Sequence, residues 1–338
     1  MEAVLYTPET AADTWQRSRH LAFFGLTEEP FQLTPDRRFF FGTSGHNTIL
    51  EVVRYGIRQG DGFIIVTGEV GTGKTLLLRM LLAEFKDEYE TALILSPLLS
   101  PTELLQAILT DIGREPETSA KLEPLLRELN SYLFSLATQG KRLAVIIDEA
   151  QNLPNETIEQ VRLLSNFESD RQKWIQIILV GQPELRTKLL RPDLRQLLQR
   201  VTIMETLMPL NPCETAAYVN FRLAQAGRED MRLNRRARNY LVRQTAGVPR
   251  RINRLMGRAL LVAYARHSPA LTTSILKEAN ASLALDRPAA TTSPRRRRLG
   301  WLLAGLACSM AFALLHYLRP DLLWTIEEAL TRLVGRTG

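Results

Sequence analysis

Short apolar runs alternate with longer amphipathic stretches between residues 60 and 208. Runs such as 63–67 and 143–147 are almost entirely apolar and predict buried strands. Stretches 101–112 and 121–137 carry apolar residues at helical spacing. Parallel strands need long crossover connections, which helices normally supply. The alternation therefore predicts an α/β fold, with a parallel sheet and helices on both faces.

Residues 209–285 show a different pattern, in which helical stretches follow one another. The first opens with Asn211 as N-cap, Pro212 at the first helical position and Glu214 three residues after the cap. This combination is typical of a helix start. The pattern predicts a helical lid domain over 209–285. Before this domain, the predicted divisions are a polar N-terminal tail (1–20) and a lead-in plus α/β domain (21–208).

The composition changes after residue 285. Residues 286–298 read as a linker that ends in four arginines. The next twenty residues, 299–318, carry no formal charge, and a helix of that length spans a bilayer core of about 30 Å. We expect a transmembrane helix there rather than a buried core helix, with the arginines on its cytoplasmic side and a short extracytoplasmic tail, 319–338. Alternatively, the arginines form a patch for nucleic acid or acidic lipid.

The overall composition adds few constraints. With 338 residues, 45% of them apolar, the chain has room for one sizeable core and a smaller domain. Four of its seven net positive charges lie in the arginine run, so the remainder is mildly basic and gives no strong nucleic-acid signal. Cys213 and Cys308 are far apart in the sequence and imply no disulfide framework.

The segment GEVGTGKT lies between the apolar run 63–67 and a helical stretch. It fits G-x-x-x-x-G-K-[ST], in which backbone N–H groups surround phosphates, the lysine reaches the β- and γ-phosphates and the hydroxyl meets Mg²⁺. A helix N-terminus beneath the phosphates adds to anion binding. Aromatic residues of the lead-in, 21–59, either cover the base or pack on the core. The predicted nucleotide-binding residues of this segment are Gly68, Glu69, Val70, Gly71, Thr72, Gly73, Lys74 and Thr75.

The second half of this site is predicted where Asp148 and Glu149 follow the run 143–147. We interpret Asp148 as the acid that holds Mg²⁺ together with Thr75, and Glu149 as the base that aligns and deprotonates the attacking water. The alternative is a pair of solvated acids at a strand end. No guanine-reading N-K-x-D segment occurs in the sequence. The motifs therefore predict an ATP hydrolase with ATP and Mg²⁺ as cofactors.

Three polar residues further along are candidates to complete the site. Gln182 ends a third predicted strand, where it contacts the γ-phosphate or the attacking water unless it is only a turn residue. Arg195 and Arg200 lie in the segment LRQLLQRV, which runs into another apolar strand. Either arginine is a candidate finger that completes a neighbour's active site, although most surface arginines are simply solvated.

Together these motifs resemble those of one family, the AAA+ ATPases of the ExeA/GspA type, which includes MshM and is related to TniB-like transposition ATPases. The resemblance covers residues 22–285 and rests on FFGLTEEPFQLTPDRRFFF, GEVGTGKT, IIDEAQNL, LVGQPEL, LLQRV and GVPRRINRL. It implies that Gln182 acts as sensor 1, Arg200 as the finger in trans and Arg250 as sensor 2. Arg195 and Arg251 remain the alternatives for the finger and for sensor 2.

The resemblance also implies a cellular role. It suggests an ATPase anchored in the bacterial inner membrane, assembled into a homo-oligomeric ring or partial ring and paired with an inner-membrane partner protein. Its expected task is to drive or regulate assembly of a type II secretion apparatus, a type IV pilus or an exopolysaccharide export system. One alternative is a DNA-binding regulator of the TniB type, which the expected membrane span disfavours. Another is a scaffold whose nucleotide only fixes the oligomer and turns over very slowly.

Overall fold

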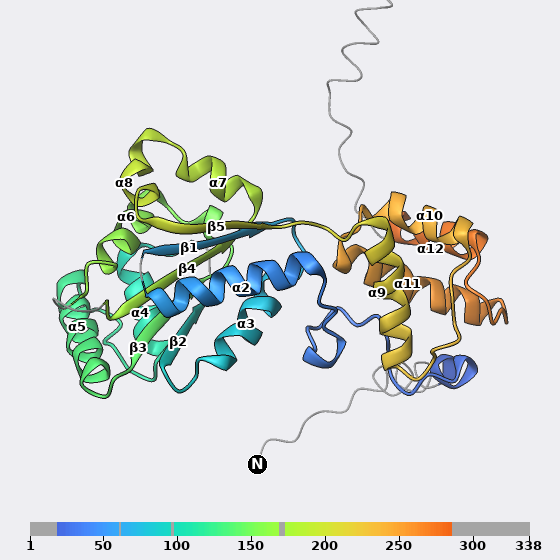
Figure 1. The fold of residues 1–338 in the computed structure, drawn as a ribbon, viewed down its shortest axis with the longest axis horizontal. Coiled ribbons are helices and arrows are strands. Elements are labelled where there is room, and N and C mark those ends of the chain that lie inside the picture. The colour runs from blue at the N-terminus through green and yellow to red at the C-terminus, as the bar shows by residue number, and fades with distance from the viewer. Residues whose placement is uncertain (1–18, 61, 96–97, 169–172, 286–338) are drawn as a thin grey trace, which may run out of the picture. The chain divides into compact units, whose positions relative to one another are not determined.

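The computed structural model describes residues 19–60, 62–95, 98–168 and 173–285, and those up to Leu283 belong to one compact unit. Its α/β part is built on a five-stranded sheet with the order β2-β3-β4-β1-β5 (Figure 1). The strands are β1 (Phe63–Gly68), β2 (Tyr89–Ile94), β3 (Arg142–Ile147), β4 (Ile175–Gly181) and β5 (Val201–Leu207). Every neighbouring pair is parallel. The predicted α/β fold with a parallel sheet is therefore confirmed.

The carboxyl ends of all five strands meet at one edge of the sheet. β1 lies between β4 and β5, with Phe63 opposite Ile177 on one side and Val201 on the other. Because ligands bind beyond the carboxyl ends of strands in open parallel sheets, this edge is where a site is expected. The loops that follow β1, β3 and β4 all lie there, and they carry most of the predicted site residues.

Helices cover both faces of the sheet. Side chains alternate along β1, so that Phe63 and Ile65 pack in one hydrophobic cluster while Ile64 and Val66 pack in another. The first cluster draws on α4 (Pro101–Asp111), α5 (Leu122–Thr138), α6 (Asn155–Leu164), α7 (Pro183–Leu189) and α8 (Arg195–Leu198). The second draws on α2 (Ser44–Gln59) and α3 (Lys74–Glu84). Burying each large apolar side chain contributes roughly 1.5–3 kcal/mol, which makes this two-sided core a rigid support for the edge loops.

A group of four helices follows the sheet in the chain (Figure 1). They are α9 (Pro212–Gln225), α10 (Arg235–Thr245), α11 (Pro249–Ala265) and α12 (Thr273–Leu285). The helix start predicted from the sequence is confirmed, since the Asn211 side chain accepts hydrogen bonds from the backbone N–H groups of Cys213 and Glu214, both at 2.9 Å. Glu214 in turn accepts the N–H of Asn211 at 2.8 Å. This reciprocal cap fixes where α9 begins.

The first part of the lead-in, residues 21–31, is part of the lid core. Phe24, Leu26 and Phe31 are buried in the same hydrophobic cluster as residues of all four lid helices. Arg222 of α9 donates from Nε to the Pro30 carbonyl at 2.5 Å. The boundary predicted between 21–208 and 209–285 therefore does not follow the hydrophobic cores at the N-terminal side. Sequence patterns miss this arrangement because the partners lie about 190 residues apart.

The predicted polar tail, 1–20, ends earlier than expected. Residues 19–24 are helical, and His20 is only 2% exposed. Its Nε2 lies 3.0 Å from a carboxylate oxygen of Glu29, so a buried imidazole here has a polar partner. His20 therefore belongs to the folded part of the chain.

The predicted linker (286–298), transmembrane helix (299–318) and extracytoplasmic tail (319–338) lie outside the described residues. Within the described ranges, no helix has both the length and the apolar character that a bilayer crossing requires.

Candidate functional site

The loop after β1 has the backbone that phosphate binding requires. Gly71 and Gly73 adopt left-handed conformations, with φ of 84° and 104°, which residues with a Cβ rarely adopt. Gly73 is the N-cap of α3 and offers no side chain to the first N–H groups of that helix. These groups and the helix dipole remain for an anion. The loop is therefore shaped to surround phosphate oxygens.

Lys74 lies folded back on this loop. Its Nζ donates to the carbonyls of Gly68 at 2.7 Å and Glu69 at 3.0 Å, and the residue is 6% exposed. Burial lowers the pKa of Lys74, although the charges of Glu149, Asp148 and Glu69 partly oppose this. Phosphate oxygens are charged acceptors and bind an ammonium more strongly than carbonyls do. The side chain is thus placed to exchange loop carbonyls for phosphate.

Thr75 and Asp148 lie together although 73 residues separate them. The Thr75 hydroxyl donates to Oδ2 of Asp148 at 2.5 Å, and Asp148 is 7% exposed at the end of β3. The other carboxylate oxygen accepts the backbone N–H of Glu149 at 2.8 Å. A hydroxyl and a carboxylate side by side are hard oxygen donors of the kind that Mg²⁺ prefers. These two residues therefore fit a magnesium ion beside the phosphate loop.

Glu149 has an unusual backbone conformation, and its side-chain carboxylate accepts hydrogen bonds from two amides. Its φ is +53°, which costs an L-residue roughly 1–2 kcal/mol. Its Oε2 accepts hydrogen bonds from Nε2 of Gln151 at 2.7 Å and Nε2 of Gln182 at 3.0 Å. Burial raises the pKa of Glu149, but these two bonds and the charge of Lys74 outweigh it, so the pKa lies below its ordinary value. The carboxylate is ionised at neutral pH and can accept a proton.

The structure places Gln182 beside Glu149, at the N-cap of α7. Sequence reasoning missed Gln151, the second amide, which lies in the short 3₁₀ turn Ala150–Asn152. The Oε1 atom of Gln151 accepts the backbone N–H of Gln182 at 3.0 Å. The only sequence signal for Gln151 was its place within IIDEAQNL, two positions after Glu149.

Two neighbouring arginines at the start of α11 differ in their relation to the loop. The backbone N–H of Arg250 donates to the Gly71 carbonyl at 3.1 Å. A Cβ on Gly71 would lie 2.3 Å from the Cβ of Arg250, so the close approach requires glycine. Both side chains are exposed, but Arg250 lines the pocket next to the loop whereas Arg251 does not. Of the two candidates for sensor 2, Arg250 is therefore the one near the phosphate loop.

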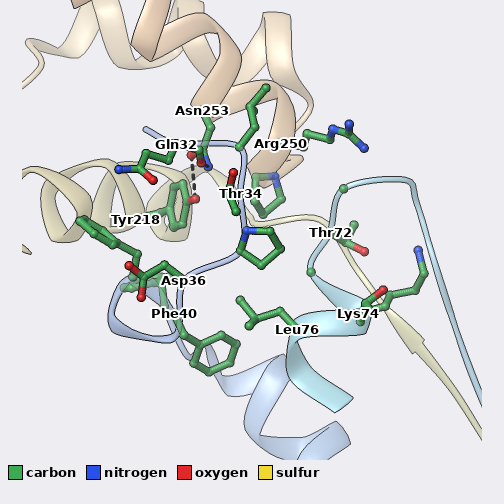
Figure 2. A pocket seen from close by; sticks show the side chains of 18 of the residues that line it. Gln32, Thr34, Asp36, Phe40, Thr72, Lys74, Leu76, Tyr218, Arg250 and Asn253 are labelled. Atoms are coloured by element: carbon green, nitrogen blue, oxygen red, sulfur yellow. Dashed lines mark hydrogen bonds between the residues drawn. The ribbon is translucent and has the colours of Figure 1, made fainter. Parts of the chain in front are cut away.

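A pocket of about 410 Å³ extends from the phosphate loop between the lead-in and the lid. Figure 2 shows Thr34 and Phe40 of the lead-in, Lys74 of the loop, and Tyr218 and Asn253 of the lid around it. The Tyr218 hydroxyl donates to Oδ1 of Asn253 at 2.7 Å. The volume and mixed lining are ordinary for a small-molecule site. The lead-in thus contributes both to the lid core and to this pocket.

The finger candidates, Arg195 and Arg200, come just before β5 in the chain. Arg200 precedes β5 at the amino edge of the sheet, and the length of β1 separates the two edges by roughly 20 Å. Its Nη1 donates to Oγ of Ser165 at 2.8 Å and to Oδ1 of Asn166 at 2.5 Å. Arg195 is exposed at the start of α8. Neither arginine lines the pocket beside the phosphate loop.

The chain is similar in sequence to known proteins. Residues 57–189 match the family model of the AAA domain. The chain is 42% identical over 246 residues to "General secretion pathway protein A" of Aeromonas hydrophila, an overlap of 73% of this chain and 45% of that protein. The chain thus spans about half the length of the curated relative it matches.

Several solved structures share the fold at low identity. They include CDC6P from Pyrobaculum aerophilum, with a TM-score of 0.62, 14% identity and coverage of 78% of this chain and 75% of that chain. Drosophila ORC bound to DNA has a TM-score of 0.61 and 16% identity, with coverage of 88% of this chain and 72% of that chain. The ADP form of Aeropyrum pernix ORC2 has a TM-score of 0.55 and 18% identity, with coverage of 74% of this chain and 71% of that chain. The fold, the AAA match and the similarity to the Aeromonas protein together show that the chain belongs to the AAA+ ATPases of the ExeA/GspA type.

Proposed function

We propose that this chain binds ATP with Mg²⁺ and hydrolyses it. The observation that supports the proposal best is the convergence of four side chains at the carboxyl edge of the sheet, where Lys74 lies beside the paired Thr75 and Asp148, and Glu149 follows directly. In this proposal Lys74 binds the β- and γ-phosphates, and Thr75 and Asp148 hold the metal. When bound, Mg²⁺ neutralises charge on the phosphates.

The chemical step falls to Glu149 in this proposal. Its free carboxylate lone pairs accept a proton from a water molecule aligned with the γ-phosphate. Gln182 contacts the same water and the phosphate, while Arg250 binds the phosphates from the lid. The low pKa of Glu149 keeps it ionised and ready to act as the base.

Hydrolysis of Mg-ATP by the purified full-length chain tests this function. We expect phosphate release by the wild type, and a loss of at least about 100-fold in Glu149→Gln, the usual scale for a general base. Glu149→Gln should still bind ATP, because it retains the phosphate loop. An absence of turnover in the wild type, or rapid turnover in Glu149→Gln, would contradict the proposal.

We further propose that the active site is completed by a second copy of the chain, because neither finger candidate lines the pocket beside the phosphate loop of its own chain. Arg195 is exposed, whereas Arg200 is engaged by Ser165 and Asn166. Mixing a Lys74→Ala chain with an Arg200→Ala chain, and separately with an Arg195→Ala chain, tests which residue acts in trans. Activity recovered in only one mixture identifies the finger, and no recovery in either would exclude a shared site built on these arginines.

The name of the Aeromonas relative suggests the cellular setting. We propose that the ATPase drives or regulates assembly of a secretion, pilus or polysaccharide-export apparatus, as a homo-oligomer with an inner-membrane partner. The proposed anchor is residues 299–318, with the ATPase on the cytoplasmic side. Alkaline extraction of membranes should leave the full chain in the pellet and release a chain that ends at residue 298. Release of the full chain would remove the anchor from this proposal.

A DNA-binding regulator is a second candidate, and the charge of the lid favours it. Residues 209–285 contain thirteen lysines and arginines against four acids, a net charge of +9. Basic surfaces of this kind attract nucleic-acid phosphates, with strong salt dependence. Fluorescence anisotropy with labelled duplex DNA at about 150 mM salt separates the two candidates. Micromolar binding that requires ATP would support the regulator, and its absence would exclude it.

A further inference from the structure

Gln151 bridges two parts of the site that come from different strands. It follows β3 in the short turn Ala150–Asn152, whereas Gln182 follows β4. Its Nε2 donates to Oε2 of Glu149 at 2.7 Å, and its Oε1 accepts the backbone N–H of Gln182 at 3.0 Å. The side-chain amide of Gln151 thus donates to Glu149, the proposed base, and accepts a hydrogen bond from the loop that follows β4.

This arrangement fixes the orientation of the amide. A backbone N–H can only donate, so the Gln151 atom facing it must be the oxygen. The NH₂ group therefore faces Glu149. A Cβ on Gly181 would lie 2.7 Å from the Gln151 oxygen, so this approach of the amide to the backbone requires a glycine at position 181.

The bridge determines which oxygen of Glu149 is available. Oε2 already accepts one bond from Gln151 and one from Gln182, at 2.7 and 3.0 Å. A carboxylate oxygen has about two lone-pair positions, and both are used. The Oε1 atom is therefore the one left to accept a proton from water. The same two bonds keep the side chain in a single orientation despite the left-handed backbone of Glu149.

We propose that Gln151 is a positioning residue for ATP hydrolysis, which holds the carboxylate of Glu149 against the loop of Gln182 so that one defined oxygen faces the attacking water. This inference rests on the proposed function. Gln151 itself contacts neither the phosphate loop nor the metal ligands in the described hydrogen bonds. Its loss should therefore reduce turnover without weakening nucleotide binding.

Two substitutions separate this role from a merely structural one. Gln151→Met has a similar length and makes neither hydrogen bond. Gln151→Glu keeps an acceptor for the N–H of Gln182 but cannot donate to Glu149 when ionised. Gln139→Met is the matched control, because Gln139 is an exposed glutamine at the end of α5 whose amide donates to the Ser135 carbonyl at 3.1 Å.

The experiment measures kcat for Mg-ATP, its dissociation constant and the melting temperature of the full chain for all four proteins. We expect both Gln151 variants to lose about 10- to 100-fold in kcat, as when a positioned group is lost, with dissociation constants within about twofold of wild type. Gln139→Met should match the wild type in both quantities.

Three other results for the Gln151 variants contradict the inference, each in a distinct way. Wild-type kcat in Gln151→Glu would mean that the residue only supports the loop of Gln182. Wild-type kcat in Gln151→Met would remove any role, and a parallel loss of ATP affinity would place Gln151 in nucleotide binding instead. If Gln151→Met melts early, Gln151→Glu, which keeps the structural acceptor, decides the question. Absence of hydrolysis in the wild type would refute the proposed function and this inference together.

Discussion

The α/β part and the lid carry opposite charge around the same pocket. Residues 21–208 contain twenty lysines and arginines against twenty-five acids, a net charge of −5, whereas residues 209–285 carry +9. The acids at the sheet edge, Asp148 and Glu149, have the carboxylate chemistry that the proposed metal binding and proton transfer need. The lid side contributes Arg250 next to the phosphate loop. The difference suggests a division of labour, with chemistry in the α/β part and phosphate sensing in the lid.

The largest expected effect comes from the one cation that the α/β part places in the phosphate loop. Lys74→Ala should weaken Mg-ATP binding by about 100-fold, because it removes charge-assisted hydrogen bonds worth roughly 1.5–3 kcal/mol each. Isothermal titration with a non-hydrolysable ATP analogue measures this loss. Lys86→Ala, an exposed lysine just after α3, is the control. Equal affinity in Lys74→Ala and wild type would remove the loop from the site.

The next effect concerns the connection between lid and lead-in. Arg222 is buried, donates to the Pro30 and Gln32 carbonyls, and lies 4.5 Å from the centre of the Phe39 ring. Arg222→Met should lower the free energy of unfolding by about 2 kcal/mol, because two carbonyls lose a charged donor. Urea denaturation measures it, with the exposed Arg236→Met as control. An unchanged midpoint would mean that the apolar lid core alone holds the lead-in.

A smaller effect is expected at the start of α11. Arg250→Ala should weaken ATP binding by about 10-fold, the equivalent of 1.4 kcal/mol, because it removes a cation from the pocket next to the phosphate loop. Arg251→Ala is the matched control from the adjacent, exposed position. The same titration compares the two variants. A larger loss in Arg251→Ala would reverse the assignment of sensor 2.

The smallest effect is expected from pH. Burial raises the pKa of Glu149, but its hydrogen bonds and Lys74 bring it below the ordinary value of 4.5. A carboxylate with a lowered pKa stays ionised until the pH falls through that pKa. Turnover should therefore change less than about twofold between about pH 8 and pH 6. A steep loss over this range, absent from ATP binding, would mean that the base has a much higher pKa.

Local patterns predicted the parallel sheet, and they located the loop and the acids that lie at its carboxyl edge. The run at β1, the glycine-lysine loop and the acids after β3 are each readable within about ten residues, because strand, loop and helix signals are local. Gln182 was found for the same reason, as the polar residue that ends a strand. The start of α9 followed from its cap residues.

Features that depend on distant partners were not readable. Phe24 and Phe31 show apolar character, but nothing local says that they pack with the lid rather than with the α/β part. Gln151 shows no special pattern, and its function arises only when the turn after β3 brings its amide to the loop after β4. The sequence did not distinguish Arg200 from Arg195 as the finger candidate. The two arginines differ in their contacts in the fold, since Arg200 donates to Ser165 whereas Arg195 is exposed.

Single-turnover hydrolysis at saturating Mg-ATP tests the division between α/β part and lid most directly. Saturation removes the contribution of binding, so only groups that act in the chemical step still matter. We predict that Glu149→Gln loses at least about 100-fold in this rate, whereas Arg250→Ala stays within about threefold of wild type. A loss in Arg250→Ala as large as that in Glu149→Gln would place the lid in the chemical step and contradict the account.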